Sequence, residues 1–246
     1  MVAGHVAGHA YDEEAGDEEE LAESAYRLSV QGLFYSTPDG KRALARDLSF
    51  VVREGMGVVI RGPSGCGKSS LVRCIAGLWS PDAGSISPAA MPGGRGGVVY
   101  MPQRPYMATG TLRQQVLYPL IESEVGVAAD ETITQLLMDF GLETVLNDWG
   151  LDGVQVWEDV LSAGEQQRLS FARVVYSQPS LAIMDEATST LDLQNEALCM
   201  QRILDEEIAI LTIAHRPSVV RYHQLMLTME LDGTFTPTPL VEMTPC

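Results

Sequence analysis

The chain has 246 residues, 46% of them hydrophobic, and a formal net charge of -17 at pH 7. This length and composition suffice for one large domain with a buried core, and they exclude a fibrous protein. The negative charge repels a phosphodiester backbone and no run of lysine or arginine offsets it, so we expect no nucleic acid partner. The four cysteines lack paired CxxC spacing, which indicates free thiols rather than a zinc site or a disulfide scaffold.

The first part of the chain is strongly acidic. Eight aspartate and glutamate residues precede the first basic residue, Arg27, and such a run is typical of a solvated tail, so we expect residues 1–24 to be disordered. The opening residues lack the basic start and apolar run of a secretory signal, and no window of about 18 apolar residues occurs in the sequence. We therefore expect the chain by itself to be soluble, which leaves a membrane-bound partner open.

Two kinds of strand pattern follow the tail. The stretches "YRLSVQGLFYS" and "LARDLSFVVREG" alternate apolar and polar residues around the turn "STPDGK", which predicts an antiparallel pair with one exposed face. The stretches "GVVIRG", "GGVVYMPQ", "LAIMDE" and "IAILTIAH" are short and almost wholly apolar, as in parallel strands covered on both faces.

Helical patterns lie between these strands, at residues 67–77, 112–120, 131–140, 163–177 and 195–205. Strands that alternate with helices predict an α/β fold with a parallel-sheet core. Residues of about 112–165 have little strand pattern and are predicted to form a helical insert. A proline- and glycine-rich loop is predicted at 87–97, and a loose C-terminal tail at 231–246.

A phosphate-binding loop follows the first apolar strand. The stretch "GPSGCGKS" matches G-x-x-x-x-G-K-[ST] and stands between a strand and a helix, the context that this motif requires. Glycines let backbone N–H groups converge on a phosphate, Lys68 reaches the β and γ phosphates, and the Ser69 hydroxyl can bind Mg²⁺. The candidate nucleotide-binding residues of the loop are Gly62, Pro63, Ser64, Gly65, Cys66, Gly67, Lys68, Ser69 and Ser70.

Polar residues stand at the C-terminal ends of the other three apolar strands. Asp185 is a candidate to hold Mg²⁺ together with Ser69, on a strand that we expect beside the loop strand. Glu186 is a candidate for orienting or deprotonating the attacking water. Gln103 could contact the metal or the water through its amide, and His215 could donate a hydrogen bond to the γ-phosphate.

Three further motifs follow along the chain: "LSAGEQ" at 161–166, "STLD" at 189–192 and "AHR" at 214–216. Together with the phosphate loop, "PQ" and "IMDE", the set resembles the nucleotide-binding domain of an ABC ATPase over residues of about 26–228, and we expect that domain to span 25–230. The resemblance implies a P-loop NTPase (RecA-like) core, an antiparallel β subdomain and a helical subdomain that carries the signature. It also implies ATP and Mg²⁺ as cofactors.

In ABC ATPases two such domains pair head to tail, and the signature turn of one covers the nucleotide of the other. By this resemblance the turn at 161–165 would act on a second nucleotide-binding domain, with a helix N-terminus facing the γ-phosphate. "STLD" would pass along the dimer interface through Ser189 and Asp192. The signature residues are Leu161, Ser162, Ala163, Gly164 and Glu165.

Two positions carry further predictions from the family pattern. The family usually has glycine where Ala163 stands. If that position needs a positive φ, the methyl group strains the turn by ~1 kcal/mol, and Ala163→Gly would then give equal or faster turnover. Tyr35 lies where many ABC domains place an aromatic ring, so it is a candidate for stacking on adenine.

The stretches "PQRPYMATGTLRQQVLYP", "WEDVLSAGEQQR" and "AGLWSPDAGSI" resemble the peroxisomal fatty-acyl half-transporters and their bacterial and plastid relatives. This resemblance implies a transmembrane domain as a partner, either fused to this domain in a longer chain or present as a separate subunit, with its coupling helix on the segment after Gln103. It implies a membrane-associated protein whose nucleotide site faces the cytosol or stroma. Fatty acyl-CoA or a lipid-like molecule is one implied substrate class, and peptides and vitamins also occur among such relatives.

Two other functions remain open at this point. A soluble ABC ATPase that moves no solute would carry tandem domains or a long coiled coil, whereas only 92 residues without heptads separate Lys68 from Leu161. A nucleotide-binding regulatory module that does not hydrolyse ATP is favoured by Ala163 and by the lack of a membrane domain in this sequence, and it is disfavoured by Glu186 and His215.

Overall fold

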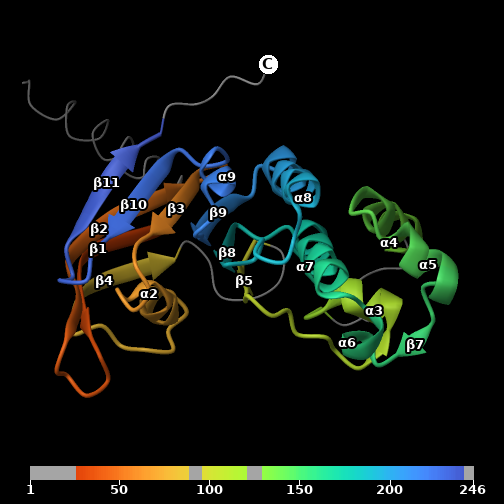
Figure 1. Cartoon of the computed structure of the whole chain (residues 1–246), viewed down its shortest axis with the longest axis horizontal. Coiled ribbons are helices and arrows are strands. Elements are labelled where there is room, and N and C mark those ends of the chain that lie inside the picture. The colour runs from red at the N-terminus through yellow and green to blue at the C-terminus, as the bar shows by residue number, and fades with distance from the viewer. Residues whose placement is uncertain (1–25, 89–95, 121–128, 241–246) are drawn as a thin grey trace, which may run out of the picture.

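The computed structural model describes residues 26–88, 96–120 and 129–240. The acidic segment 1–24 and most of the predicted loop at 87–97 lie outside these ranges. Figure 1 shows a mixed sheet that runs from the left edge to the middle of the molecule, with the antiparallel sheet and α2 on the left and most of the helices on the right. Within the described ranges, no helix is long and apolar enough to cross a membrane.

The smaller sheet is antiparallel and has the strand order β2-β1-β4. β1 and β2 pair as predicted, with Leu28 opposite Val52, so the predicted pair is confirmed. β4 was not predicted, because its sequence "AGSISP" is rich in small residues and has only one β-branched apolar side chain. The strand bounds are β1 Tyr26–Ser36, β2 Ala43–Arg53 and β4 Ala83–Pro88.

The central sheet has the order β11-β10-β3-β9-β8-β5. Its strands are parallel except for the antiparallel pair of β10 and β11. The four predicted apolar strands are confirmed as β3, β5, β8 and β9, and so is the α/β class with an antiparallel subdomain. The bounds are β3 Gly57–Arg61, β5 Val98–Met101, β8 Leu181–Asp185, β9 Ala209–Ile213, β10 Leu225–Met229 and β11 Phe235–Pro239.

The prediction of a loose tail from residue 231 is wrong for Phe235–Pro239. These residues form edge strand β11, in which Phe235 lies opposite Met229 and Pro239 lies opposite Leu225. The two prolines of "FTPTP" indicated a loop. Proline is nevertheless tolerated on an edge strand, because the outer side of that strand needs no N–H donor.

Helices flank the central sheet and connect its strands (Figure 1). Helix α7 has the predicted bounds, α2 and α8 differ from prediction by a few residues, and α9 was not predicted. The bounds are α2 Lys68–Ile75, α7 Ala163–Ser177, α8 Leu193–Asp205 and α9 Pro217–Val220.

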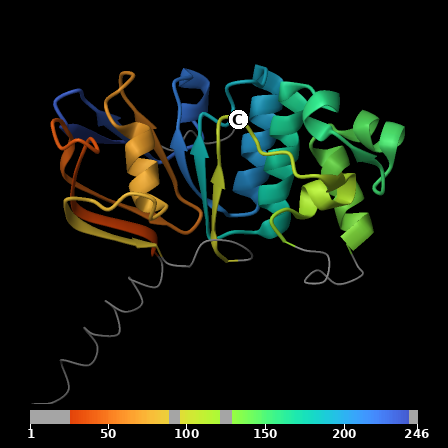
Figure 2. The same cartoon turned by 90° about the horizontal axis from the view of Figure 1, so that it is seen from below.

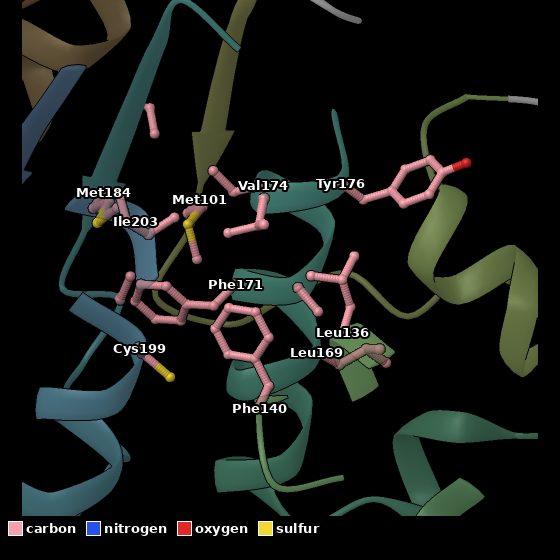
Figure 3. Close-up of a cluster of buried hydrophobic side chains, with 14 of the residues drawn as sticks. Met101, Leu136, Phe140, Leu169, Phe171, Val174, Tyr176, Met184, Cys199 and Ile203 are labelled. Carbon is pink, nitrogen blue, oxygen red and sulfur yellow. The ribbon is translucent and has the colours of Figure 1, made fainter. Parts of the chain in front are cut away.

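The central strands bury both of their faces. In β8, Leu181 and Ile183 belong to the core that includes α2 and the antiparallel sheet, whereas Ala182 and Met184 belong to the core that includes α7 and α8. This double burial explains why the strand reads as a continuous apolar run. Figure 3 shows part of the second core, where side chains of α7 and α8 meet those of β5 and β8.

The segment predicted as a helical insert forms a helical region at one end of the molecule, as Figure 2 shows. A two-stranded antiparallel ladder, β6 with β7, joins its two ends and was not predicted. Helix α7 contacts α3 and α4 and runs from this region to the central sheet. The bounds are β6 Gly110–Thr111, α3 Leu112–Leu117, α4 Ala129–Asp139, α5 Glu143–Trp149, β7 Val154–Gln155 and α6 Trp157–Val160.

Candidate functional site

The loop between β3 and α2 depends on its glycines. Gly62 has a φ of 151°, and a Cβ there would lie 2.3 Å from the carbonyl oxygen of Met229. Gly67 has a φ of 114°, and a Cβ there would lie 2.9 Å from Leu44 Cβ. Any larger residue at these two positions would need a strained backbone and a shift of its neighbours. The two glycines therefore let the loop pack closely against Met229 and Leu44 at the end of the strand.

Lys68 lies over this loop. Its Nζ donates hydrogen bonds to the carbonyl oxygens of Gly62 (2.9 Å) and Pro63 (3.0 Å). The residue is buried and is the first residue of α2, whose N-terminus carries a partial positive charge. An ammonium group and a helix N-terminus thus converge at one point, an arrangement that attracts an anion.

A cavity of about 280 Å³ opens above the loop, between the end of the central sheet and the turn that joins β1 to β2. Arg42 lies in its wall and was not among the predicted residues. The Nη2 atom of Arg42 donates to the carbonyl oxygens of Gly65 and Leu231, so the turn is held against the loop. The lining residues are Thr37, Arg42, Leu44, Ser64, Gly65, Gly67, Lys68, Ser69, Ser70, Glu186 and His215.

Tyr35 does not offer its ring to a nucleobase, so this prediction is wrong. Its exposed fraction is 1%, and its hydroxyl donates to the carbonyl oxygen of Gly67 at 3.1 Å. Burial raises the pKa of Tyr35, which keeps the hydroxyl a donor. A register shift of β1 between Val30 and Leu33 turns this side chain towards the core, where it supports the phosphate loop from beneath.

Three of the predicted polar residues meet at the carboxyl ends of β5, β8 and β9. Gln103 Nε2 donates to Glu186 Oε2 at 3.0 Å, and His215 Nε2 lies 3.2 Å from Glu186 Oε1. The backbone N–H of Glu186 donates to the carbonyl oxygen of Ile213, and its φ is 53°. A left-handed backbone is rare for glutamate and persists only where the surroundings enforce it, as is common in functional sites.

Asp185 precedes this group and has a different contact. Tyr100 Oη donates to Asp185 Oδ2 at 3.3 Å, and burial, followed by the charge of Asp185, raises the pKa of Tyr100 to about 12. The expectation that the strand of Asp185 lies beside the loop strand is wrong, because β9 separates β8 from β3.

The candidate metal ligands fit Mg²⁺. The hydroxyl of Ser69, the amide oxygen of Gln103 and a carboxylate oxygen of Asp185 are the hard oxygen donors that Mg²⁺ prefers.

The signature turn is a capped helix start. Ser162 is the N-cap of α7: its Oγ accepts from the N–H of Glu165, and its own N–H donates to Glu165 Oε2 at 2.9 Å. Ala163 is the first residue of the helix and has no positive φ. The strain expected at Ala163 is therefore absent, and so is the reason to expect faster turnover from Ala163→Gly.

The signature turn lies apart from the phosphate loop. None of the described residues that line the cavity belongs to Leu161–Glu165. Figure 1 shows α6 and the start of α7 on the side of the molecule away from α2. Ser162 and Ala163 are exposed, and so are Ser189 and Asp192. Hydrogen bonds from Asn195 hold the pKa of Asp192 below its usual value, so this carboxylate caps α8 in its charged form.

The fold and the site define a class of protein. A glycine-rich loop joins a buried parallel strand to a helix, and a lysine at the helix start faces a cavity that polar residues of neighbouring strands also line. The cavity opens at the carboxyl edge of the sheet, where open α/β folds bind their ligands. This combination defines a P-loop nucleotide-binding domain.

Sequence comparison identifies the family. The family described as "ABC transporter" matches residues 45–189, so the chain belongs to the ABC transporter family and is an ATP-binding domain of it. An ABC transporter ATP-binding protein of Synechocystis sp., itself described as uncharacterized, is 39% identical over 214 residues, which cover 87% of this chain and 31% of that protein. ATP-binding cassette sub-family D member 3 of Homo sapiens is 40% identical over 204 residues, which cover 81% of this chain and 30% of that protein.

A solved structure agrees with the fold. The structure of a bacterial Atm1-family ABC exporter with ATP bound has a TM-score of 0.69 and 22% identity, and the match covers 83% of this chain and 37% of that one. The predicted resemblance to the half-transporter group is confirmed by the relatives of sub-family D. The chain spans about a third of the length of the curated relatives that it matches.

Proposed function

We propose that this chain binds Mg²⁺ and ATP in the cavity above the phosphate loop and hydrolyses the ATP, as the motor domain of a membrane transporter. The observation that carries the proposal is the meeting of two groups at one cavity. Lys68 and Ser69 lie on one side of it, and Glu186 and His215 lie on the other. An anion site and a candidate base thus face the same space.

The contacts of each residue support a distinct role. Lys68 would exchange the carbonyls of Gly62 and Pro63 for phosphate oxygens, which are stronger acceptors for an ammonium group. Glu186 would hold the attacking water, because contacts with Gln103 and His215 fix both of its carboxylate oxygens. His215 would donate to the γ-phosphate.

Ser69, Gln103 and Asp185 would hold Mg²⁺. The ion, when bound, supplies positive charge that offsets the charge of the phosphates. Tyr100, bonded to one carboxylate oxygen of Asp185, leaves the other oxygen for the metal shell.

The position of the signature turn supports a site made by two copies. Ser162 and Ala163, at the start of α7, are exposed and lie outside the cavity of their own chain. A second nucleotide-binding domain, paired head to tail, would bring this helix N-terminus to the γ-phosphate, with Ser189 and Asp192 along the interface. ATP would then favour the closed dimer because it contacts both copies, and hydrolysis would release it.

The surface that follows Gln103 supports a transmembrane partner. Tyr106 and Tyr118 are exposed, with ring centroids 5.3 Å apart. Arg173 of α7 contacts both residues. Its guanidinium donates to the carbonyl oxygen of Tyr106 at 2.6 Å and stacks on the ring of Tyr118, with Cζ 5.5 Å from the ring centroid. Exposed aromatic side chains on a rigid support are typical of an interaction surface. From the sub-family D resemblance, we infer a fatty acyl-CoA or lipid-like substrate for the assembled transporter.

The structure removes one argument for a regulatory module that does not hydrolyse ATP. Ala163 was one reason to consider it, and Ala163 occupies an unstrained helical position. The contacts of Glu186 with Gln103 and His215 support hydrolysis instead.

Replacing Lys68 with alanine tests the proposed nucleotide site. Loss of hydrogen bonds from a charged donor costs about 1.5–3 kcal/mol, so the Kd for Mg·ATP should rise roughly 10- to 150-fold in equilibrium dialysis. Lys41→Ala is the matched control, because Lys41 is exposed and outside the cavity, and it should bind as the wild type does. An unchanged Kd in Lys68→Ala would remove the loop from its proposed role.

A further inference from the structure

Arg216, the residue after His215, connects two parts of the site that lie apart in the sequence. Its Nη1 atom donates to the carbonyl oxygen of Leu191 at 2.6 Å, and its Nη2 atom donates to the carbonyl oxygen of Ser189 at 2.9 Å. Both acceptors lie in "STLD", the segment with the exposed residues Ser189 and Asp192. One planar guanidinium therefore fixes the backbone of this segment at two points.

A buried carboxylate holds Arg216 in place. Nη1 also lies 3.3 Å from Oε2 of Glu196, a residue of α8 whose side chain has an exposed fraction of 0%. The other oxygen, Oε1, has no hydrogen-bond partner in the part of the chain that the structure describes. A buried carboxylate of this kind needs a cation beside it, so Glu196 anchors the guanidinium under the segment.

The contacts of Arg216 link it to Glu186 both through His215 and through Ser189. Glu186 contacts His215 through their side chains, and His215 adjoins Arg216 in the chain. Arg216 holds Ser189, whose backbone N–H donates back to the carbonyl oxygen of Glu186 at 3.0 Å. Displacement of "STLD" would therefore shift the side-chain pair of Glu186 and His215 through two connections. One connection is Arg216, which is bonded to Ser189 and adjoins His215, and the other is the hydrogen bond from Ser189 to Glu186.

We propose that Arg216 is a positioning residue that makes the Glu186–His215 pair sensitive to the docking of a second copy on "STLD". This inference rests on the proposed function and adds a regulatory step to it. When a second copy fixes Ser189 and Asp192, Arg216 and His215 are held in place, and the carboxylate of Glu186 is aligned for hydrolysis. In a single copy these hydrogen bonds hold the segment without support from a partner, so the pair is held less firmly than in the dimer. Binding of ATP does not need the contacts of Arg216, because Arg216 does not line the nucleotide cavity.

The test separates positioning from stability. Arg216→Met alone would leave Glu196 buried without its cation, so we pair it with Glu196→Met, because an apolar pair can replace a buried ion pair without loss of stability. Arg216→Lys is the second variant, since it keeps the charge beside Glu196 but lacks the planar fork that reaches two carbonyls. Arg221→Met is the matched control, because Arg221 donates to the Tyr222 hydroxyl instead of to "STLD".

The measurements are the Kd for ATP, the turnover at saturating ATP, its dependence on protein concentration, and the thermal unfolding midpoint. We expect the double variant and Arg216→Lys to bind ATP within about twofold of the wild type, with turnover at least tenfold lower and the rise of specific activity with protein concentration lost. Arg221→Met should match the wild type throughout. Wild-type turnover in Arg216→Lys or in the folded double variant would overturn this inference but leave the proposed function standing. A wild-type chain that binds no ATP would instead overturn the proposed function, and the inference with it.

Discussion

Glu186→Gln is expected to lower ATP turnover by about a hundredfold to ten-thousandfold while the Kd for Mg·ATP stays close to that of the wild type. The amide keeps the size of the side chain and can still bond to Gln103 and His215, but it cannot take a proton from water. Phosphate release measured under saturating ATP, together with equilibrium dialysis, checks both halves of this expectation.

Glu143→Gln provides the matched control for this variant. Glu143 is exposed at the start of α5, far in the sequence from the cavity residues, and the same change of charge there should leave turnover unaltered. If Glu186→Gln released phosphate as fast as Glu143→Gln does, the water-activating role of Glu186 would have to be abandoned.

The folded protein is expected to lose about 3 kcal/mol of stability as the pH falls from 6.5 to 4, on account of His223. Burial lowers the pKa of His223 from 6.5 to about 4, so between these values the unfolded chain binds a proton that the folded chain does not. The contribution is present in full above pH 6.5 and is lost progressively down to pH 4. His223 Nδ1 lies 2.9 Å from the carbonyl oxygen of Val219, and Nε2 lies 2.8 Å from the hydroxyl of Thr212, a pairing that a neutral ring satisfies.

Urea unfolding at several pH values checks this expectation, because His223→Gln removes the titrating ring. The variant should have a flatter dependence of unfolding free energy on pH between 6.5 and 4 than the wild type. Equal slopes in wild type and His223→Gln would contradict a neutral buried His223.

Much of the site could be predicted because its motifs have local causes. The phosphate loop needs glycines, a lysine and a flanking strand and helix, all within "GVVIRGPSGCGKSS", and the structure has this arrangement. The apolar strands ended by Gln103, Glu186 and His215 indicated a parallel sheet, whose carboxyl edge brings those residues together. The order of the motifs and the apolar pattern of the strands were sufficient to predict the phosphate loop and the residues beside it.

The remaining features depend on tertiary contacts between distant segments. Tyr35 was expected to be accessible, but a bulged pairing of β1 with β2 turns it into the core. Arg42 joins the cavity only because the turn folds back onto Gly65 and Leu231. The left-handed backbone of Glu186 has no local signature either, since it depends on the neighbouring strand β9. Sequence periodicity carries no information about such contacts.

The mass of the Glu186→Gln chain in light scattering, measured with Mg·ATP and with Mg·ADP, tests whether two copies share the nucleotide site. We expect the mass of two chains with ATP and of one chain with ADP. We also expect Ser162→Glu, which sets a negative charge against the γ-phosphate of the other copy, to abolish the dimer without abolishing ATP binding. A chain saturated with ATP that stays a monomer at every protein concentration, or a dimer that persists in Ser162→Glu, would contradict a nucleotide site shared between two copies.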